Sequence, residues 1–243
     1  MSQTTVDVAT PRGTMPTYVH RPDGTGPSPR VLVYMDAPGI RPALLGYAER
    51  LAEAGYTAIV PDLYYPFDPA EKFDAERLAA GDKEEFARMR KLVGQIDDEQ
   101  VLDDTRLLLE AVPGTDGGEW ACIGFCMGGR LGMRAAEAFG TEIAAASLLH
   151  PTGLVTDGPD SPHLEVDRVD AGLYLGFGES DSVTPVSTIP PLRERLDQAG
   201  VVHRIEVFPG AEHGFTMPDR PAYDEAAAEQ AWAGTLAVLA ERL

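Results

Sequence analysis

One stretch constrains the fold of this 243-residue chain more than any other. Residues 120–130 read Trp-Ala-Cys-Ile-Gly-Phe-Cys-Met-Gly-Gly-Arg. The apolar first half predicts a short buried strand, and the residues after Cys126 predict the start of a helix. Because Gly124 and Gly128 flank Cys126, the chain can make a sharp, strained turn there without collisions between side chains. The Cys126 thiol would then lie at a helix N-terminus, where the helix dipole favours the thiolate.

This pattern is the Gly-x-nucleophile-x-Gly elbow of α/β-hydrolases, with cysteine in place of the more usual serine. A match to so short a pattern is weak by itself, so the rest of the chain must support it. The alternative for Cys126 is an inert buried thiol, but the flanking glycines favour a nucleophile. Cys122 lies inside the predicted strand, and we interpret it as a packing residue.

The rest of the chain alternates strands and helices, which predicts a doubly wound, mostly parallel α/β sheet with helices on both faces. We expect one domain over residues 1–243, with an antiparallel hairpin around Pro11-Arg12-Gly13 at the sheet edge. Residues 66–84 are polar and contain prolines, so we expect an excursion outside the core that could form a flap. The other expected strands are 30–35, 57–60, 143–149, 173–177 and 202–208, and the expected helices are 42–54, 85–112 with a break near Gly94, 128–139, 190–199 and 221–242.

Composition narrows the classes of partner. The formal net charge of −19 argues against nucleic acid or an anionic membrane, because both require a basic patch. No run approaches the roughly eighteen consecutive apolar residues of a membrane span. The first residues do not resemble a secretory signal, and the two cysteines are not placed for a disulfide, so we expect a cytoplasmic protein. A strand-to-elbow geometry also does not favour a metal site built from these cysteines and a histidine.

Three residue types needed for covalent acyl transfer occur in the order nucleophile, acid, histidine. Cys126, Asp181 and His213 each follow a predicted strand, so a parallel sheet would bring them to one edge. Cys126 would attack a carbonyl carbon. His213 would keep the thiolate available and later take a proton from water, and Asp181 would orient the imidazole. The acids that compete with Asp181 for this role are Asp157, Asp160, Asp167, Asp170 and Glu179.

The oxyanion hole of such a fold comes from the backbone. One N–H would belong to Met127, the residue after the nucleophile. The other would belong to Ala37, in the loop after the strand at 30–35, because Pro38 has no N–H. His150 also follows a predicted strand and could line the rim of a pocket, with helix capping or plain exposure as the alternative.

At this point the chain resembles the dienelactone hydrolase family, the carboxymethylenebutenolidases and their relatives. The shared motifs cover most of the chain, and they are the Gly-Phe-Cys-Met-Gly-Gly elbow, Gly-Tyr-x-x-x-x-Pro-Asp-Leu-Tyr at 55–64, Phe-Gly-Glu-x-Asp-x-x-x-Pro at 177–185, and His-Gly-Phe at 213–215. The resemblance implies a Cys126–His213–Asp181 triad, an α/β-hydrolase fold without a large lid domain, and no cofactor.

Two features depart from the family pattern. Family members carry a glutamate near the oxyanion loop that helps to control the thiol, and the matching residue here is the shorter Asp36. The two arginines that hold a substrate carboxylate in dienelactone hydrolases correspond to Pro66 and Met217, neither of which can pair with a carboxylate. Arg41 and Arg220 are the candidates to replace them.

These observations favour a carboxylic ester or lactone hydrolase that forms an acyl-thioester on Cys126 and acts on a small, neutral substrate, as a monomer or homodimer. Two alternatives stay open: acyl transfer to another acceptor by the same triad, and a non-catalytic binding protein or redox sensor in which Cys126 is an oxidisable thiol. The residues expected to form an apolar substrate pocket are Tyr64, Phe125, His150, Phe215 and Met217.

Overall fold

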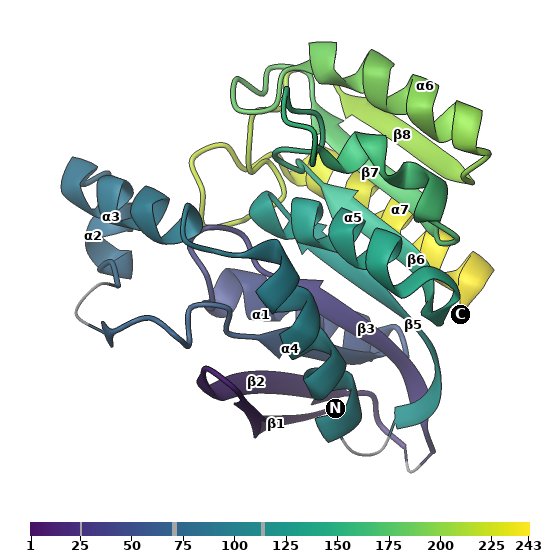
Figure 1. Ribbon diagram of the computed structural model, residues 1–243. Helices are drawn as coiled ribbons and strands as arrows, with labels where there is room; N and C mark the ends of the chain where they lie inside the picture. Colours follow the sequence, from purple (N-terminus) through teal and green to yellow (C-terminus); the bar gives the residue numbers. More distant parts are fainter. Residues whose placement is uncertain (25, 70–71, 113–114) are drawn as a thin grey trace.

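A computed structural model describes residues 1–24, 26–69, 72–112 and 115–243. Within these residues, eight strands form one sheet in the order β1-β2-β4-β3-β5-β6-β7-β8 (Figure 1). The strands from β4 to β8 in that order are parallel, while β2 runs antiparallel to both β1 and β4. The predicted α/β-hydrolase fold with an antiparallel hairpin at the edge is confirmed.

The strands and helices have the following bounds. The strands are β1 Ser2–Thr10, β2 Gly13–Arg21, β3 Ser28–Tyr34, β4 Thr57–Pro61, β5 Thr115–Phe125, β6 Ile143–Leu149, β7 Gly172–Gly178 and β8 His203–Phe208. The α-helices are α1 Pro42–Glu53, α2 Ala75–Ala79, α3 Lys83–Val93, α4 Asp98–Ala111, α5 Met127–Phe139, α6 Ile189–Ala199 and α7 Glu225–Arg242. Short 3₁₀ turns lie at Gly140–Glu142, Pro162–Leu164, Val166–Arg168 and Val186–Thr188.

The central strands are apolar along their whole length because helices cover both faces of the sheet. Helices α4 and α5 lie in front of the sheet in Figure 1, and α1 and α7 lie behind it. Val31, Leu32 and Val33 are consecutive residues of β3, and all three are completely buried. A strand buried on both faces has no polar side, which is why this stretch of sequence does not alternate.

The helix expected over residues 85–112 is two helices. Helix α3 ends at Gly94, and α4 starts after Asp97, whose carboxylate accepts the N–H of Gln100 at 3.2 Å. Aspartates that cap helix N-termini also start α3, at Asp82, and α7, at Asp224. These caps set helix boundaries that apolar spacing alone places only approximately.

The polar segment before α4 stands away from the sheet. Helices α2 and α3 project from the body at one side, as Figure 1 shows. Helix α2 has five residues and follows the capping carboxylate of Asp74. Residues 66–84 therefore leave the sheet as predicted, although Phe67 and Phe73 pack against the core. Residues 70 and 71 lie outside the described residues, and the sequence pattern did not indicate α2.

Two glycines allow the first turn of α5 to lie directly against the sheet. A Cβ atom on Gly124 would come within 2.0 Å of the carbonyl oxygen of Gly128, and one on Gly128 would come within 2.3 Å of the carbonyl oxygen of Tyr34. Both contacts are with backbone, which cannot move aside as a flexible side chain can. The close approach of β3, β5 and α5 thus requires glycine at both positions.

Gly128→Ala should lower the free energy of unfolding by about 1–3 kcal/mol, because the added methyl group overpacks a backbone contact. Gly46, inside α1, is the matched control, since a Cβ atom there meets nothing within 4 Å. Gly46→Ala should raise the free energy of unfolding by about 0.5–1 kcal/mol. Urea denaturation followed by circular dichroism measures both changes, and a Gly128→Ala variant as stable as the parent would contradict the steric account.

Candidate active site

Cys126 occupies a strained turn between β5 and α5. Its φ of 56° lies in the left-handed region, which residues other than glycine rarely adopt. Three backbone hydrogen bonds hold this conformation: the Cys126 N–H donates to Leu149 at 3.1 Å, and its carbonyl accepts the N–H groups of Gly129 and Thr152, each at 3.0 Å. The turn at Cys126 is therefore fixed from both the helix side and the end of β6.

The structure brings the three expected catalytic residues together. His213 Nε2 lies 3.1 Å from Cys126 Sγ, and His213 Nδ1 lies 2.7 Å from Asp181 Oδ2. The other oxygen of Asp181 accepts the backbone N–H groups of Val183 and Thr184, each at 2.8 Å. Because its side chain is completely buried and both oxygens are bonded, Asp181 can hold the imidazole in one orientation.

The site favours a protonated His213. Burial by itself lowers the pKa of this imidazole, but hydrogen bonds to Asp181 and Cys126 and their negative charges outweigh it and raise the pKa to about 9. A proton on His213 at neutral pH leaves an imidazolium beside the sulfur of Cys126.

Asp181→Asn should lower the pKa of His213 from about 9 toward the ordinary histidine value of 6.5. A raised histidine pKa stabilises the folded protein below pH 6.5, and this contribution is lost as the pH rises through about 9. The wild type should therefore be more stable than the variant, and the difference in unfolding free energy should be larger at about pH 6 than at about pH 10. NMR titration of the imidazole and urea denaturation measure the two effects, and an unchanged His213 titration would contradict the account.

Two backbone N–H groups are available for an oxyanion. The carbonyl of Asp36 accepts the Gly39 N–H at 2.9 Å, so the Ala37 N–H, on the opposite side of the same peptide, points away from that turn. Met127 is the first residue of α5. Within the described parts of the chain, neither the Ala37 nor the Met127 N–H has a hydrogen-bond partner. The Tyr64 hydroxyl donates to the Ala37 carbonyl at 2.7 Å and steadies the loop.

A cleft of about 380 Å³ opens beside His213. Its walls come from the loop after β3, from α2 and α3, and from the loops after β7 and β8. The projecting segment of the chain thus forms one side of the site. The residues that line the cleft are Pro38, Arg41, Leu78, Gly81, Phe86, Val183, Glu212, His213, Asp219, Arg220, Pro221 and Ala222.

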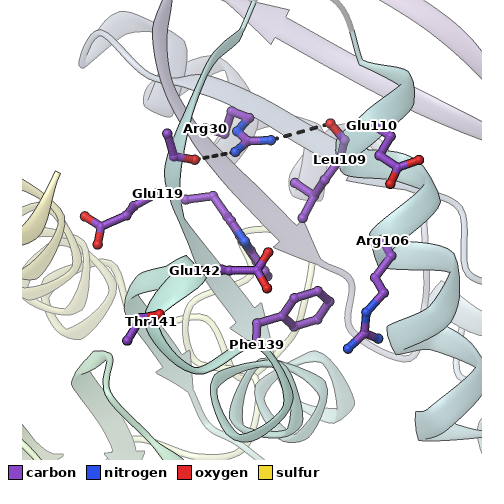
Figure 2. Close-up of a pocket in the computed structure, with 10 residues that line it drawn as sticks. Arg30, Arg106, Leu109, Glu110, Glu119, Phe139, Thr141 and Glu142 are labelled. Atoms are coloured by element: carbon purple, nitrogen blue, oxygen red, sulfur yellow. Dashed lines mark hydrogen bonds between the residues drawn. The ribbon is translucent and has the colours of Figure 1, made fainter.

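A larger cavity, of about 550 Å³, lies at the opposite end of the strands and contains none of the three expected catalytic residues. Figure 2 shows Arg30 there, with its guanidinium donating to the carbonyl oxygens of Leu109 and Gly118. Arg30 thereby ties the end of α4 to β5. The larger volume does not make this cavity the candidate site, because His213, which contacts both Cys126 and Asp181, lines the smaller cleft.

The sequence profile of the dienelactone hydrolase family matches residues 15–243. The chain belongs to the dienelactone hydrolase family. A Synechocystis protein assigned as a carboxymethylenebutenolidase is 28% identical over 243 residues, which cover 94% of this chain and 95% of the relative. A Bradyrhizobium protein assigned as a 2-oxo-3-(5-oxofuran-2-ylidene)propanoate lactonase is 27% identical, with 96% and 92% of the two chains covered. A solved structure described as a dienelactone hydrolase from Klebsiella pneumoniae aligns with a TM-score of 0.86 and 28% identity, and covers 99% of this chain and 98% of its own.

In this member of the dienelactone hydrolase family, Asp36 forms an ion pair with Arg41 that the sequence did not predict. Both oxygens of Asp36 accept hydrogen bonds from the guanidinium of Arg41, one of them at 2.9 Å, and Arg41 also pairs with Asp219. The Asp36 carboxylate therefore lies on Arg41, and modulation of the thiol by Asp36 stays a prediction. Burial raises the pKa of Asp36 even though the charge of Arg41 opposes that change.

Arg41→Met should lower the free energy of unfolding by about 3–5 kcal/mol at neutral pH, because it leaves the buried Asp36 charge unpaired. Asp219→Asn is the control and should cost about 1 kcal/mol or less, since the Asp219 side chain is 41% exposed. Without Arg41, the pKa of the buried Asp36 carboxyl should rise further in the folded state, so the folded variant binds a proton more readily than the unfolded chain does. The loss of unfolding free energy in Arg41→Met should therefore shrink as the pH falls. Denaturation at several pH values measures this, and a deficit that grows toward acid pH would contradict it.

The residues expected to form the substrate pocket are buried. Tyr64 is 5% exposed, His150 is 1% exposed, and the other three are completely buried. None of the five is among the residues that line the cleft, and their role in binding substrate stays a prediction. Apolar side chains near strand ends belong to the core here, and His150 is neither exposed nor a helix cap. The expected pocket residues that the structure places in the core are Tyr64, Phe125, His150, Phe215 and Met217.

Three apolar side chains that the sequence pattern did not indicate line the cleft, and they belong to Leu78, Phe86 and Val183. Cys122, as expected, packs in the core, where burial raises the pKa of its thiol.

Across residues 1–24, 26–69, 72–112 and 115–243, no group of three or more His, Cys, Asp or Glu side chains is placed to hold a metal ion. In that same part of the chain, no helix combines the length and apolar character needed to cross a bilayer.

Proposed function

We propose that this protein hydrolyses a small, neutral ester or lactone through a Cys126–His213–Asp181 triad and an acyl-thioester intermediate. The observation that carries the proposal is the position of the His213 ring. It lies 3.1 Å from the Cys126 sulfur and 2.7 Å from the Asp181 carboxylate, at the wall of the 380 Å³ cleft. A nucleophile, a base and an orienting acid in this order of contact are what acyl transfer requires.

In the first half of the reaction, the Cys126 thiolate attacks the carbonyl carbon and a carbon–sulfur bond forms. The carbonyl oxygen becomes an oxyanion that accepts the N–H groups of Ala37 and Met127. When the oxyanion collapses, the carbon–oxygen bond to the leaving group breaks and the His213 imidazolium protonates the departing alkoxide. For a lactone, the alcohol formed in this step stays attached to the acyl group.

In the second half, His213 is neutral and takes a proton from a water molecule as that water attacks the thioester carbon. The carbon–sulfur bond breaks, the Cys126 thiolate leaves, and the acid product is released. The imidazolium beside the thiolate is thereby restored, and one water molecule has been consumed. Asp181 stabilises the charged imidazole in both halves of the cycle.

The charges in the cleft support a neutral substrate. Besides the His213 imidazolium, which is paired with the Asp181 carboxylate, two cations, Arg41 and Arg220, line it together with two carboxylates, Glu212 and Asp219. Arg41 is already bound by Asp219 and by a third carboxylate, Asp36. The cleft therefore has no excess positive charge to hold a substrate carboxylate. The assignment of the Bradyrhizobium relative as a lactonase supports a lactone among the candidate substrates.

We also propose that the chain acts as a single domain, as a monomer or homodimer, in the cytoplasm and without a cofactor. Both cysteines are free thiols, which a reducing compartment would maintain. The triad supplies every group that ester hydrolysis needs.

Turnover of paired small esters and lactones, neutral and carboxylated, tests the proposal. Wild type should hydrolyse the neutral member of each pair faster, and Cys126→Ala should lose roughly a thousandfold or more in kcat. Cys122→Ala is the matched control, because it removes the other thiol, which is buried in the preceding strand. It should retain wild-type turnover. Full activity in Cys126→Ala would refute the triad, and faster hydrolysis of the carboxylated members would refute the neutral substrate.

A further inference from the structure

His150 holds an unusual position directly after β6. Its φ of 38° makes it, together with Cys126, one of two non-glycine residues with a positive φ in the described chain. The backbone on either side of it holds the nucleophile elbow: the Leu149 carbonyl accepts the Cys126 N–H, and the Thr152 N–H donates to the Cys126 carbonyl. A strained residue thus lies at the centre of the segment that fixes the nucleophile.

The imidazole of His150 connects this segment to the loop that carries His213. His150 Nε2 lies 2.8 Å from the hydroxyl oxygen of Thr216, three residues after His213. The Thr216 carbonyl is held in turn by the Tyr47 hydroxyl at 2.7 Å. The rings of His150 and His213 have centroids 5.1 Å apart and planes inclined at 74°. His150 is 1% exposed and does not line the cleft, so its ring contacts the His213 ring from the interior of the protein.

His150 can occupy this place because it is neutral. Burial, followed by the charge of His213 and then those of Arg220 and Arg41, holds the pKa of His150 well below the ordinary histidine value. All three charges lower the pKa of His150. A second cation 5.1 Å from the His213 imidazolium would repel it, whereas a neutral imidazole packs against it and still bonds to Thr216.

We propose that His150 is a positioning residue for the thiol hydrolysis proposed above, on which this inference rests. Its bond to Thr216 and its ring contact hold the His213 imidazole in register between Cys126 and Asp181. Phenylalanine in this place could supply the ring contact but could not bond to Thr216. The alternative is that His150 only fills space in the core.

Thr216→Val removes the hydroxyl that holds His150 and keeps the volume of the side chain. Its kcat with a neutral ester should fall by about 10- to 100-fold, because a base displaced by a fraction of an ångström loses its alignment. KM should change by less than about twofold. In an NMR titration, the His213 pKa should fall below its wild-type value of about 9. His150→Phe should have the same direction of effect, and Thr216→Ser, which keeps the hydroxyl, should restore both readouts.

Thr235→Val is the matched control. The Thr235 hydroxyl lies 2.7 Å from that of Ser147, in a buried pair between α7 and the same strand β6. Removing it should cost stability without changing kcat or the His213 titration. Wild-type values of both readouts in folded Thr216→Val and His150→Phe would overturn the proposal, as would equal losses in Thr235→Val. If Cys126→Ala kept full activity, the hydrolase proposal would fail, but the His213 titration would still decide whether His150 positions that ring.

Discussion

The contact between the first turn of α5 and the backbone of β3 is the constraint on which the rest of the site depends. At Gly128 the two backbones approach so closely that a methyl group would lie 2.3 Å from the Tyr34 carbonyl oxygen. This approach places Cys126 on a turn with a positive φ and brings the start of α5 next to the loop that contains Ala37. The positions of Cys126, of the start of α5 and of the two candidate oxyanion donors therefore share a single steric cause.

The charges of the site follow from that geometry. Asp181 is buried with both oxygens bonded, so its charge acts on His213 with little screening by water. The raised pKa of His213 and the neutral state of His150 are two consequences of one arrangement, since an imidazolium and a neutral imidazole can pack together where two cations cannot. A second ion pair joins Asp36 to Arg41. Asp36 is the residue that matches the family's thiol-controlling glutamate.

The sequence was sufficient for the fold and for the three residues that the structure brings together, because Cys126, Asp181 and His213 each follow an apolar strand and parallel strands end at one edge. It was insufficient for the pocket. Apolar residues near strand ends, such as Phe125, proved to be core, while the cleft wall includes Leu78 from a five-residue helix whose start depends on one capping aspartate.

The pairing of Asp36 with Arg41 depends on the path of a loop, which carries no periodic signal. His150 followed a strand as predicted, but its burial depends on a contact with Thr216, far away in the sequence.

The central claim is that catalysis passes through a covalent bond to Cys126, and rapid-quench mass spectrometry tests it most directly. Wild-type protein would be mixed with an activated neutral ester, quenched in acid during turnover, and analysed intact and after proteolysis. The account predicts one acyl group per chain, located on the peptide that contains Cys126, which forms and decays with kinetics that match turnover. Steady turnover with no acylated protein, or an acyl group on any other residue, would contradict it.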